Sequence, residues 1–226
     1  MRHGKKYLDK RKKYDPTVSY GLQEALDLVK TLATARFDET VDLSVKLNLK
    51  KSQSVRDTVV LPYQFRGEKR ILVFCKAEKE KEAQEAGATY IGAEDLIEKI
   101  KGGWLDFDVA VATPDMMKDV GKLGMVLGRR GLMPNPKTGT VTFDIKGAVA
   151  ELRKGRTEFR ADKTGVVHLA VGKVSMEKDK VAENIKTAVA EIKRKRPVDA
   201  KGEFIRTISV ASTMGSGVWV SIKDEE

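Results

Sequence analysis

Hydrophobic and polar residues follow two different periodicities near the start of the chain. Apolar residues within positions 22–32 are spaced three and four apart, which predicts an amphipathic helix that ends near Ala33, with Ser19 as its N-cap. Apolar and polar residues then alternate over residues 41–49, which predicts a strand with one buried face. Residues 58–61 are the predicted partner of that strand.

From residue 70 the pattern changes to short apolar strands that alternate with more polar helices. This order is typical of βα units, whose strands form a parallel sheet covered by helices. The predicted strands are residues 71–75, 89–91 and 109–112, and the predicted helices are residues 79–86, 94–101, 115–127 and 144–154.

After residue 155 the chain returns to strands arranged around one amphipathic helix. The helix has an apolar stripe backed by Lys and Glu, so its apolar side is expected to pack on a sheet. The predicted elements are a strand at residues 166–171, the helix at 177–194, and strands at 204–211 and 218–222.

The two ends of the chain share one pattern of predicted strands and amphipathic helices, and the middle has a different pattern, which indicates a discontinuous domain. We expect an α/β protein, in which residues 1–67 and 158–226 form an α+β two-layer terminal domain. Residues 68–157 form an inserted three-layer, Rossmann-like α/β domain. The crossings near residues 66–67 and 155–156 contain glycine, so the two domains are expected to move relative to each other.

Positive charge is concentrated in the two ends. The 226 residues include 43 Lys and Arg against 33 Asp and Glu, which gives a net charge of +10. The insert holds 16 basic and 14 acidic residues and the ends hold 27 and 19, so their net charges are +2 and +8. Lys and Arg gain free energy by releasing counterions from phosphates, so we expect a polyanionic partner on the terminal domain. A solvated face or a membrane-surface patch would give the same totals.

Cysteine, histidine and hydropathy patterns argue against several other functions. Cys75 is the single cysteine and lies in an apolar run, which excludes an internal disulfide and predicts a buried, inert thiol. His3 and His168 are the only histidines, and Asp106 and Asp108 are expected to be solvated, so we expect no enzyme, metal or cofactor. No apolar stretch approaches the ~18 residues that span a bilayer, so a soluble cytoplasmic protein is expected.

The segment of residues 128–140 combines glycine, proline and cations in one loop. A P-loop needs glycine directly before Lys-Ser/Thr, but Pro136, which has no N–H, occupies that place. Gly121, Gly124 and Gly128 also miss the spacing of a dinucleotide site. The segment is interpreted as a rigid surface loop or as a basic loop that meets RNA, and a nucleotide site on the α/β insert is the competing hypothesis.

Three segments place cations, hydroxyls, an aromatic ring and glycine just before predicted strands. They are residues 36–40, 160–165 and 212–217. If these strand starts converge, they form one surface suited to phosphate, 2′-OH and base contacts. Taken singly, each has a structural interpretation: Phe37 is more often a core residue, and Met214 is more often part of a turn.

Six motifs follow one another along the chain. They are Phe-Asp-Glu-Thr-Val at 37–41, Val-Val-Leu-Pro at 59–62, Ala-Val-Ala-Thr-Pro-Asp at 110–115, Gly-Leu-Met-Pro-Asn-Pro-Lys at 131–137, Asp-Lys-Thr-Gly at 162–165 and Ser-Thr-Met-Gly at 212–215. In these motifs, over nearly its whole length, the chain resembles the L-one family of bacterial large-subunit ribosomal proteins. The resemblance implies a protein, monomeric when free, that binds 23S rRNA at the mobile stalk near the exit site. It also implies assistance in releasing deacylated exit-site tRNA and repression of translation from the messenger RNA of its own operon.

The resemblance also assigns RNA binding to particular residues. Gly215 would permit close backbone approach, threonine hydroxyls would reach 2′-OH groups, and Arg36 and Lys163 would meet phosphates. Asp162 would orient Lys163 or accept a hydrogen bond from a 2′-OH. The full set is Arg36, Phe37, Thr40, Asp162, Lys163, Thr164, His168, Thr213, Met214 and Gly215.

Overall fold

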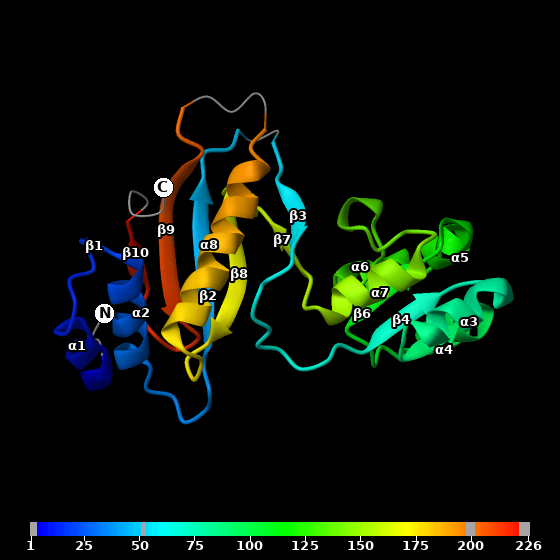
Figure 1. Cartoon of the computed structure of the whole chain (residues 1–226), viewed down its shortest axis with the longest axis horizontal. Helices are drawn as coiled ribbons and strands as arrows, with labels where there is room; N and C mark the ends of the chain where they lie inside the picture. Colours follow the sequence, from blue (N-terminus) through cyan, green and yellow to red (C-terminus); the bar gives the residue numbers. More distant parts are fainter. Residues whose placement is uncertain (1–3, 51–52, 198–201, 222–226) are drawn as a thin grey trace. The chain divides into compact units, whose positions relative to one another are not determined.

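The chain forms two compact units, and it crosses between them twice (Figure 1). A computed structural model describes residues 4–50, 53–197 and 202–221. The first unit is discontinuous and the second is one continuous segment. Their bounds are Met1–Phe65 with Phe159–Glu226 for the first unit, and Arg66–Glu158 for the second.

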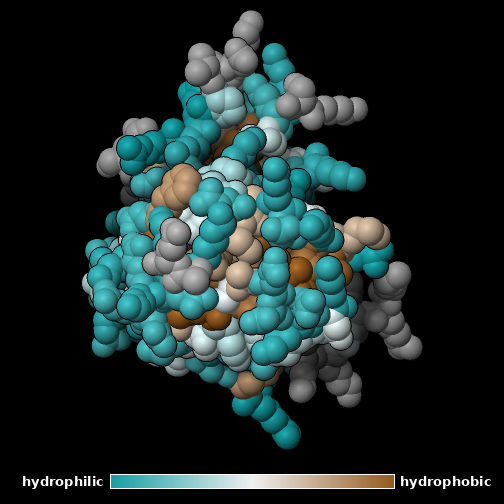
Figure 2. Space-filling view, turned by 90° about the vertical axis from the view of Figure 1, so that its right-hand side faces the viewer, coloured by the Kyte–Doolittle hydropathy of each residue, from teal (hydrophilic) through white to brown (hydrophobic). Residues whose placement is uncertain are grey.

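Hydrophilic side chains cover most of the face that Figure 2 shows, with hydrophobic groups visible in places. This surface agrees with a composition in which 34% of the residues are charged. Among the residues described, no helix has both the length and the apolar character that crossing a membrane requires.

The first unit is built on a five-stranded sheet with the order β1-β10-β9-β2-β8. The β1–β10 pair is parallel, and the other neighbours are antiparallel. Helices α2 and α8 pack on one face of this sheet (Figure 1). The strands are β1 (Ser19–Tyr20), β2 (Thr40–Leu47), β8 (Val166–Lys173), β9 (Ile205–Ser212) and β10 (Val218–Val220); the helices are α1 (Lys5–Arg11), α2 (Leu22–Leu32) and α8 (Lys178–Arg194).

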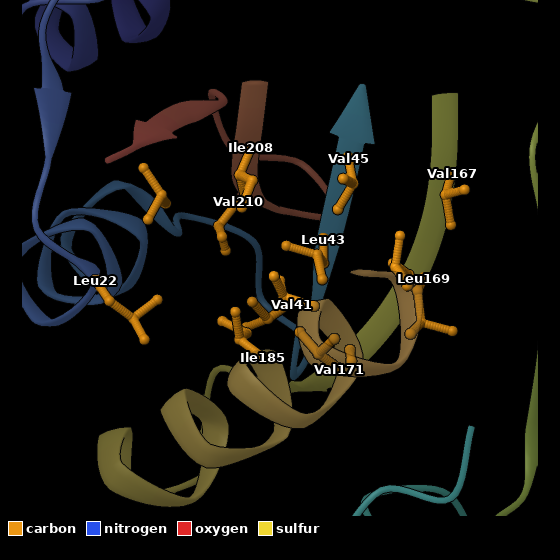
Figure 3. Packing of buried hydrophobic residues seen from close by; sticks show 14 of the residues in the cluster. Leu22, Val41, Leu43, Val45, Val167, Leu169, Val171, Ile185, Ile208 and Val210 are labelled. Carbon is orange, nitrogen blue, oxygen red and sulfur yellow. The ribbon is translucent and has the colours of Figure 1, made fainter. Parts of the chain in front are cut away.

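The core of the first unit lies between the sheet and these two helices. Alternation along β2 buries Val41, Leu43 and Val45 against apolar side chains from both helices, such as Leu22 and Ile185 (Figure 3). The predicted strand, the predicted helices and their apolar stripes are confirmed here.

Asn184 of α8 is a polar residue inside this core, and its side chain is completely buried. Its amide accepts a hydrogen bond from the Tyr63 backbone N–H and donates to the carbonyls of Tyr63 (2.9 Å) and Val171 (2.8 Å). These bonds offset the cost of burying the amide and tie α8 to the sheet and to the segment that leads to the second unit.

Two local predictions in this unit are wrong. Ser19 is not the N-cap of α2; it pairs with β10 as part of β1, and Gly21 is the N-cap. Residues 58–61 do not pair with β2, since β3 (Arg56–Val59) pairs instead with β7 (Thr157–Arg160). The reason is length: β8 and β9 have 8 residues each, as β2 does, and form longer ladders with it than the 4 residues of β3 could.

The second unit has three layers, as predicted. Strand β4 runs parallel to β5 on one side and β6 on the other. Leu72 and Phe74 of β4 face a core shared with α4, α5 and α6, and Ile71 and Val73 face a core shared with α3 and α7. The elements are β4 (Ile71–Phe74), β5 (Tyr90–Gly92), β6 (Val109–Ala112), α3 (Ala77–Glu85), α4 (Glu94–Lys101), α5 (Met117–Gly121), α6 (Gly124–Arg129) and α7 (Ile145–Arg153), with 3-10 turns η1 (Pro114–Met116) and η2 (Pro136–Thr138).

The predicted single helix over residues 115–127 is instead broken into η1, α5 and α6. Gly121 ends α5 and Gly124 begins α6, and glycine has low helix propensity. The break turns Leu123 inward, where it is 1% exposed. Cys75 is fully buried as predicted, and burial raises the pKa of its thiol.

Candidate nucleic-acid interface

The sheet of the first unit has a second face, opposite α2 and α8, that carries partly exposed side chains. We call this surface the open face. Along β2 every second residue points to it, because the alternate residues are buried in the core. Polar residues dominate this row, which consists of Thr40, Asp42, Ser44 and Lys46.

Residues 36–40 and 213–215 meet at the end of the open face where β2 begins. The Thr40 N–H donates to the Thr213 hydroxyl (3.0 Å), and the Thr213 N–H donates to the Thr40 carbonyl (3.0 Å). Phe37 is 57% exposed and Met214 is 65% exposed, so Phe37 is not the core residue that its type suggests. We call this arrangement, together with the exposed Arg36, the corner.

A buried carboxylate holds the two segments of the corner together. Glu39 is 2% exposed, and it accepts hydrogen bonds from the backbone N–H groups of Thr34 (3.1 Å), Ala35 (2.9 Å) and Met214 (2.9 Å). Burial acts to raise the pKa of Glu39, but the hydrogen bonds from the backbone N–H groups, that of Ala35 foremost, help to outweigh it, and that pKa is lowered. Glu39 is therefore an ionised anchor of the Met214 backbone.

Glu39 was not among the predicted site residues, although a signal for it exists in the sequence. The apolar residues of β2 occupy the odd positions from Val41 to Leu47, and Glu39 continues the same phase toward the core. A charged residue in the buried phase of a strand needs hydrogen-bond partners, and it therefore marks a place where the backbone is being organised.

The turn at Thr213–Gly215 is also fixed from within. Gly215 donates its N–H to the Ser212 carbonyl (2.9 Å), and a Cβ at Gly215 would lie 2.2 Å from the Ser212 hydroxyl oxygen. A larger residue here would force the Ser212 hydroxyl to move, so packing inside the protein favours glycine, in addition to the predicted close approach of a ligand. Lys10 of α1 donates to the Met214 carbonyl (3.3 Å), which brings one basic side chain of the N-terminal helix to the corner.

The third predicted segment, residues 160–165, lies at the opposite end of the open face. Because β8 is antiparallel to β2, Thr40 pairs with Lys173 and Lys46 pairs with Val166. Residues 160–165 therefore do not converge with the other two segments, since antiparallel neighbours start at opposite ends. The two ends are about 20 Å apart at the usual rise of a strand.

At this far end Asp162 closes a tight turn with its own neighbours. Its carboxylate accepts from the N–H groups of Thr164 and Val166 (2.8 Å each) and from the Thr164 hydroxyl (2.8 Å). The bonds from Val166 and Thr164 lower the pKa of Asp162. The carboxylate thus shapes the turn, which differs from the expected role of orienting Lys163, and Lys163 itself is exposed.

His168 lies in the middle of the open face, between these two ends. Its imidazole is exposed, and its Nδ1 lies 3.0 Å from the Ser44 hydroxyl on β2. Lys46 donates to the Thr164 carbonyl, which ties β2 to the Asp162 turn. The predicted residues therefore form a band along one sheet face, with the corner at one end and the Asp162 turn at the other.

Groups that could support other chemistry are engaged elsewhere. The residues that the structure describes include no cluster of His, Cys, Asp and Glu that could hold a metal ion. Asp106 and Asp108 both bind Arg70, which the sequence did not predict; Asp108 accepts from its backbone and side chain. Hydrogen bonds from Arg70 lower the pKa of Asp108. Arg70 and the two aspartates therefore form an ion-paired cluster just before β4.

Hydrogen bonds brace the second half of the loop of residues 128–140. The Asn135 side chain accepts from the Lys137 N–H (2.9 Å), and its backbone N–H donates to the Thr140 hydroxyl (2.8 Å). The Thr138 side chain is buried, and Gly139 adopts a positive φ of 66°. This geometry favours the interpretation as a rigid surface loop and leaves Lys137 at the surface.

Comparisons with known proteins give one consistent result. A model of the "Ribosomal protein L1p/L10e family" matches residues 28–216. A large ribosomal subunit protein uL1 of Treponema denticola is 65% identical over 223 residues, which cover 99% of each chain. The uL1 of Treponema pallidum (strain Nichols) is 58% identical over 226 residues and 100% of each chain, and that of Leptospira biflexa is 53% identical, over 99% of this chain and 97% of its own.

Proposed function

The chain belongs to the ribosomal protein L1p/L10e family, and from this premise we propose that its open face binds 23S rRNA at the mobile stalk, near the exit site. In this proposal, residues 1–67 with 158–226 are the RNA-binding domain and residues 68–157 are an inserted domain. Membership of the family makes the chain a structural protein of the large ribosomal subunit, and not an enzyme.

One observation carries the proposal for RNA binding. Phe37 and Met214 are large apolar side chains that remain 57% and 65% exposed on a corner held by a buried carboxylate. A fixed apolar projection on a polar, basic surface is suited to the ribose and base surfaces of a folded RNA, because it loses little entropy on binding. Arg36 and Lys163 supply charge for phosphates at the two ends of the band.

We extend the proposal to two further roles that the family resemblance implies. A messenger RNA leader that presents the same shape as the rRNA site would compete for the same band, which would make the protein a repressor of its own operon. A protein bound at the stalk near the exit site would also contact deacylated tRNA and assist its release. Both roles need the RNA complex, so both depend on the corner.

The test is a pair of matched substitutions. Met214→Asp is expected to weaken binding to a stalk rRNA fragment by about five-fold to one-hundred-fold, or about 1–3 kcal/mol, by removing an apolar contact and adding a negative charge. Met125→Asp makes the same change at a side chain that is 77% exposed in the second unit, and it is expected to leave affinity unchanged. Equal affinity for both variants in filter binding would count against the corner as the RNA site.

A further inference from the structure

A single row of side chains crosses all the strands of the open face. The sheet register places His168 of β8 opposite Ser44 of β2, and Ser44 opposite Ser209 of β9. Ser209 in turn lies opposite Trp219 of β10, and Trp219 lies opposite Ser19 of β1. His168 and Trp219 are thus separated by two serines, over about 14 Å at the usual strand spacing.

Trp219 is the unusual member of this row. It is a large aromatic residue, 40% exposed, in a row whose other members are a histidine and three serines. Its neighbours Val218 and Val220 point the other way and are buried in the core. Because the side chains beside it on both adjacent strands are serines, its indole is flanked by small groups. The core packing of the first unit therefore does not account for a tryptophan here.

The other tryptophan of the chain shows the contrast. Trp104 lies in the second unit, where its ring packs edge-on against Tyr90 at 4.8 Å between centroids and lies 5.7 Å from that of Phe107. Its place is explained by the aromatic cluster that it joins.

The surroundings of Trp219 are basic. A groove at one end of the sheet is lined by Trp219 and Arg206 together with Lys193, from the end of α8 on the other face of the sheet, and Arg196 just beyond it; apolar residues such as Phe204 and Ile208 complete the lining. Glu203 is an acidic residue in its lining, and hydroxyl groups of Ser19 and other residues also line it. A flat aromatic surface flanked by cations and hydroxyls matches single-stranded nucleic acid, because bases stack on the ring and phosphates meet the cations.

We propose that Trp219 is a stacking platform for an unpaired nucleotide of the bound RNA, with its phosphates near Lys193 and Arg206. This inference rests on the proposed function and extends its surface across β10 to β1. The hairpin β9–β10 supports it, since the same hairpin carries Met214 in its turn and Trp219 in its second strand. An RNA strand seated on the corner therefore has a continuous polar path to the indole along the open face.

Fluorescence gives a direct test. In a Trp104→Phe variant, Trp219 is the only tryptophan, and we expect its emission to be quenched when a stalk rRNA fragment is added. Trp219→Ala should weaken binding of the same fragment by about ten-fold, the effect of losing one base–aromatic stack. Trp219→Phe should retain most of the affinity, and Trp104→Phe alone should change nothing. Melting curves of each variant verify that the fold is intact.

The outcomes separate this inference from the proposed function. If wild-type protein binds the stalk fragment no better than an unrelated duplex at the same salt concentration, the proposed function fails and the platform fails with it. If wild type binds and Met214→Asp weakens binding, but Trp219→Ala has no effect and emission is unquenched, only the platform is refuted. Quenching by intact large subunits but not by the RNA fragment would place the indole against another part of the subunit and would also overturn the platform.

Discussion

Glu39→Gln tests whether the corner depends on its buried carboxylate. One carboxylate oxygen accepts from Thr34 and Ala35, and the other accepts from Met214. Glutamine can keep an oxygen toward the first pair, but its NH2 group then faces the Met214 N–H, so a donor meets a donor. A buried donor without an acceptor costs about 1–3 kcal/mol, and this cost falls on the turn that presents Met214.

We therefore expect Glu39→Gln to reduce affinity for a stalk rRNA fragment by about five-fold to one-hundred-fold, the equivalent of that cost. Urea unfolding should show a loss of stability of at most similar size, because the rest of the core is untouched. Asp144→Asn is the matched control: its carboxylate also accepts from a backbone N–H, that of Gly147 (2.9 Å), but it lies in the second unit, so RNA affinity should be unchanged. Equal RNA affinities for wild type and Glu39→Gln would refute the argument that the carboxylate orders the turn.

Four further outcomes are expected. Gly165→Ala should destabilise the protein by about 1–2 kcal/mol in urea unfolding, because Gly165 has a φ of +80° and a Cβ there would lie 3.2 Å from the Leu47 carbonyl oxygen. Cys75 should react with a thiol reagent only at the rate of unfolding, and fast labelling of native protein would contradict its burial. The folded-state pKa values of Glu39 and Asp162 are lowered. Their contribution to stability should therefore be complete above about pH 4–5 and should be lost as the pH falls through the lowered pKa values. A melting temperature that rose on acidification in that range would contradict this expectation. Small-angle scattering should detect a change in shape on RNA binding if the glycine-containing crossings act as a hinge, and one unchanged shape would refute it.

Periodicity in the sequence was sufficient to predict elements but not their partners. The alternation of β2 and the stripe of α8 follow directly from the spacing of apolar residues, and both were confirmed. Which strand pairs with β2 depends on matching lengths across more than a hundred residues of chain, and no local pattern encodes that. The predicted pairing of residues 58–61 is wrong for this reason, whereas residues 160–165 lie apart from the corner because β8 runs antiparallel to β2.

In the candidate site, too, the sequence predicted individual residues but not the contacts between them. Residue types near strand starts indicated Phe37, Met214 and Lys163, whose exposure the structure shows. The hydrogen bonds that the Glu39 and Asp162 carboxylates accept were not predicted, because their backbone N–H donors come close only in the folded turns. The row that includes Trp219 likewise exists only in the register between strands.

The discontinuity of the first unit sets an order on synthesis. Strand β2 is made early, but its neighbours β8 and β9 begin only at Val166 and Ile205, after the whole second unit. The second unit can fold from one continuous stretch before either neighbouring strand of β2 has been made. A nascent chain that stops short of residues 213–215 therefore lacks the corner, so the candidate surface is completed only in the last steps of synthesis.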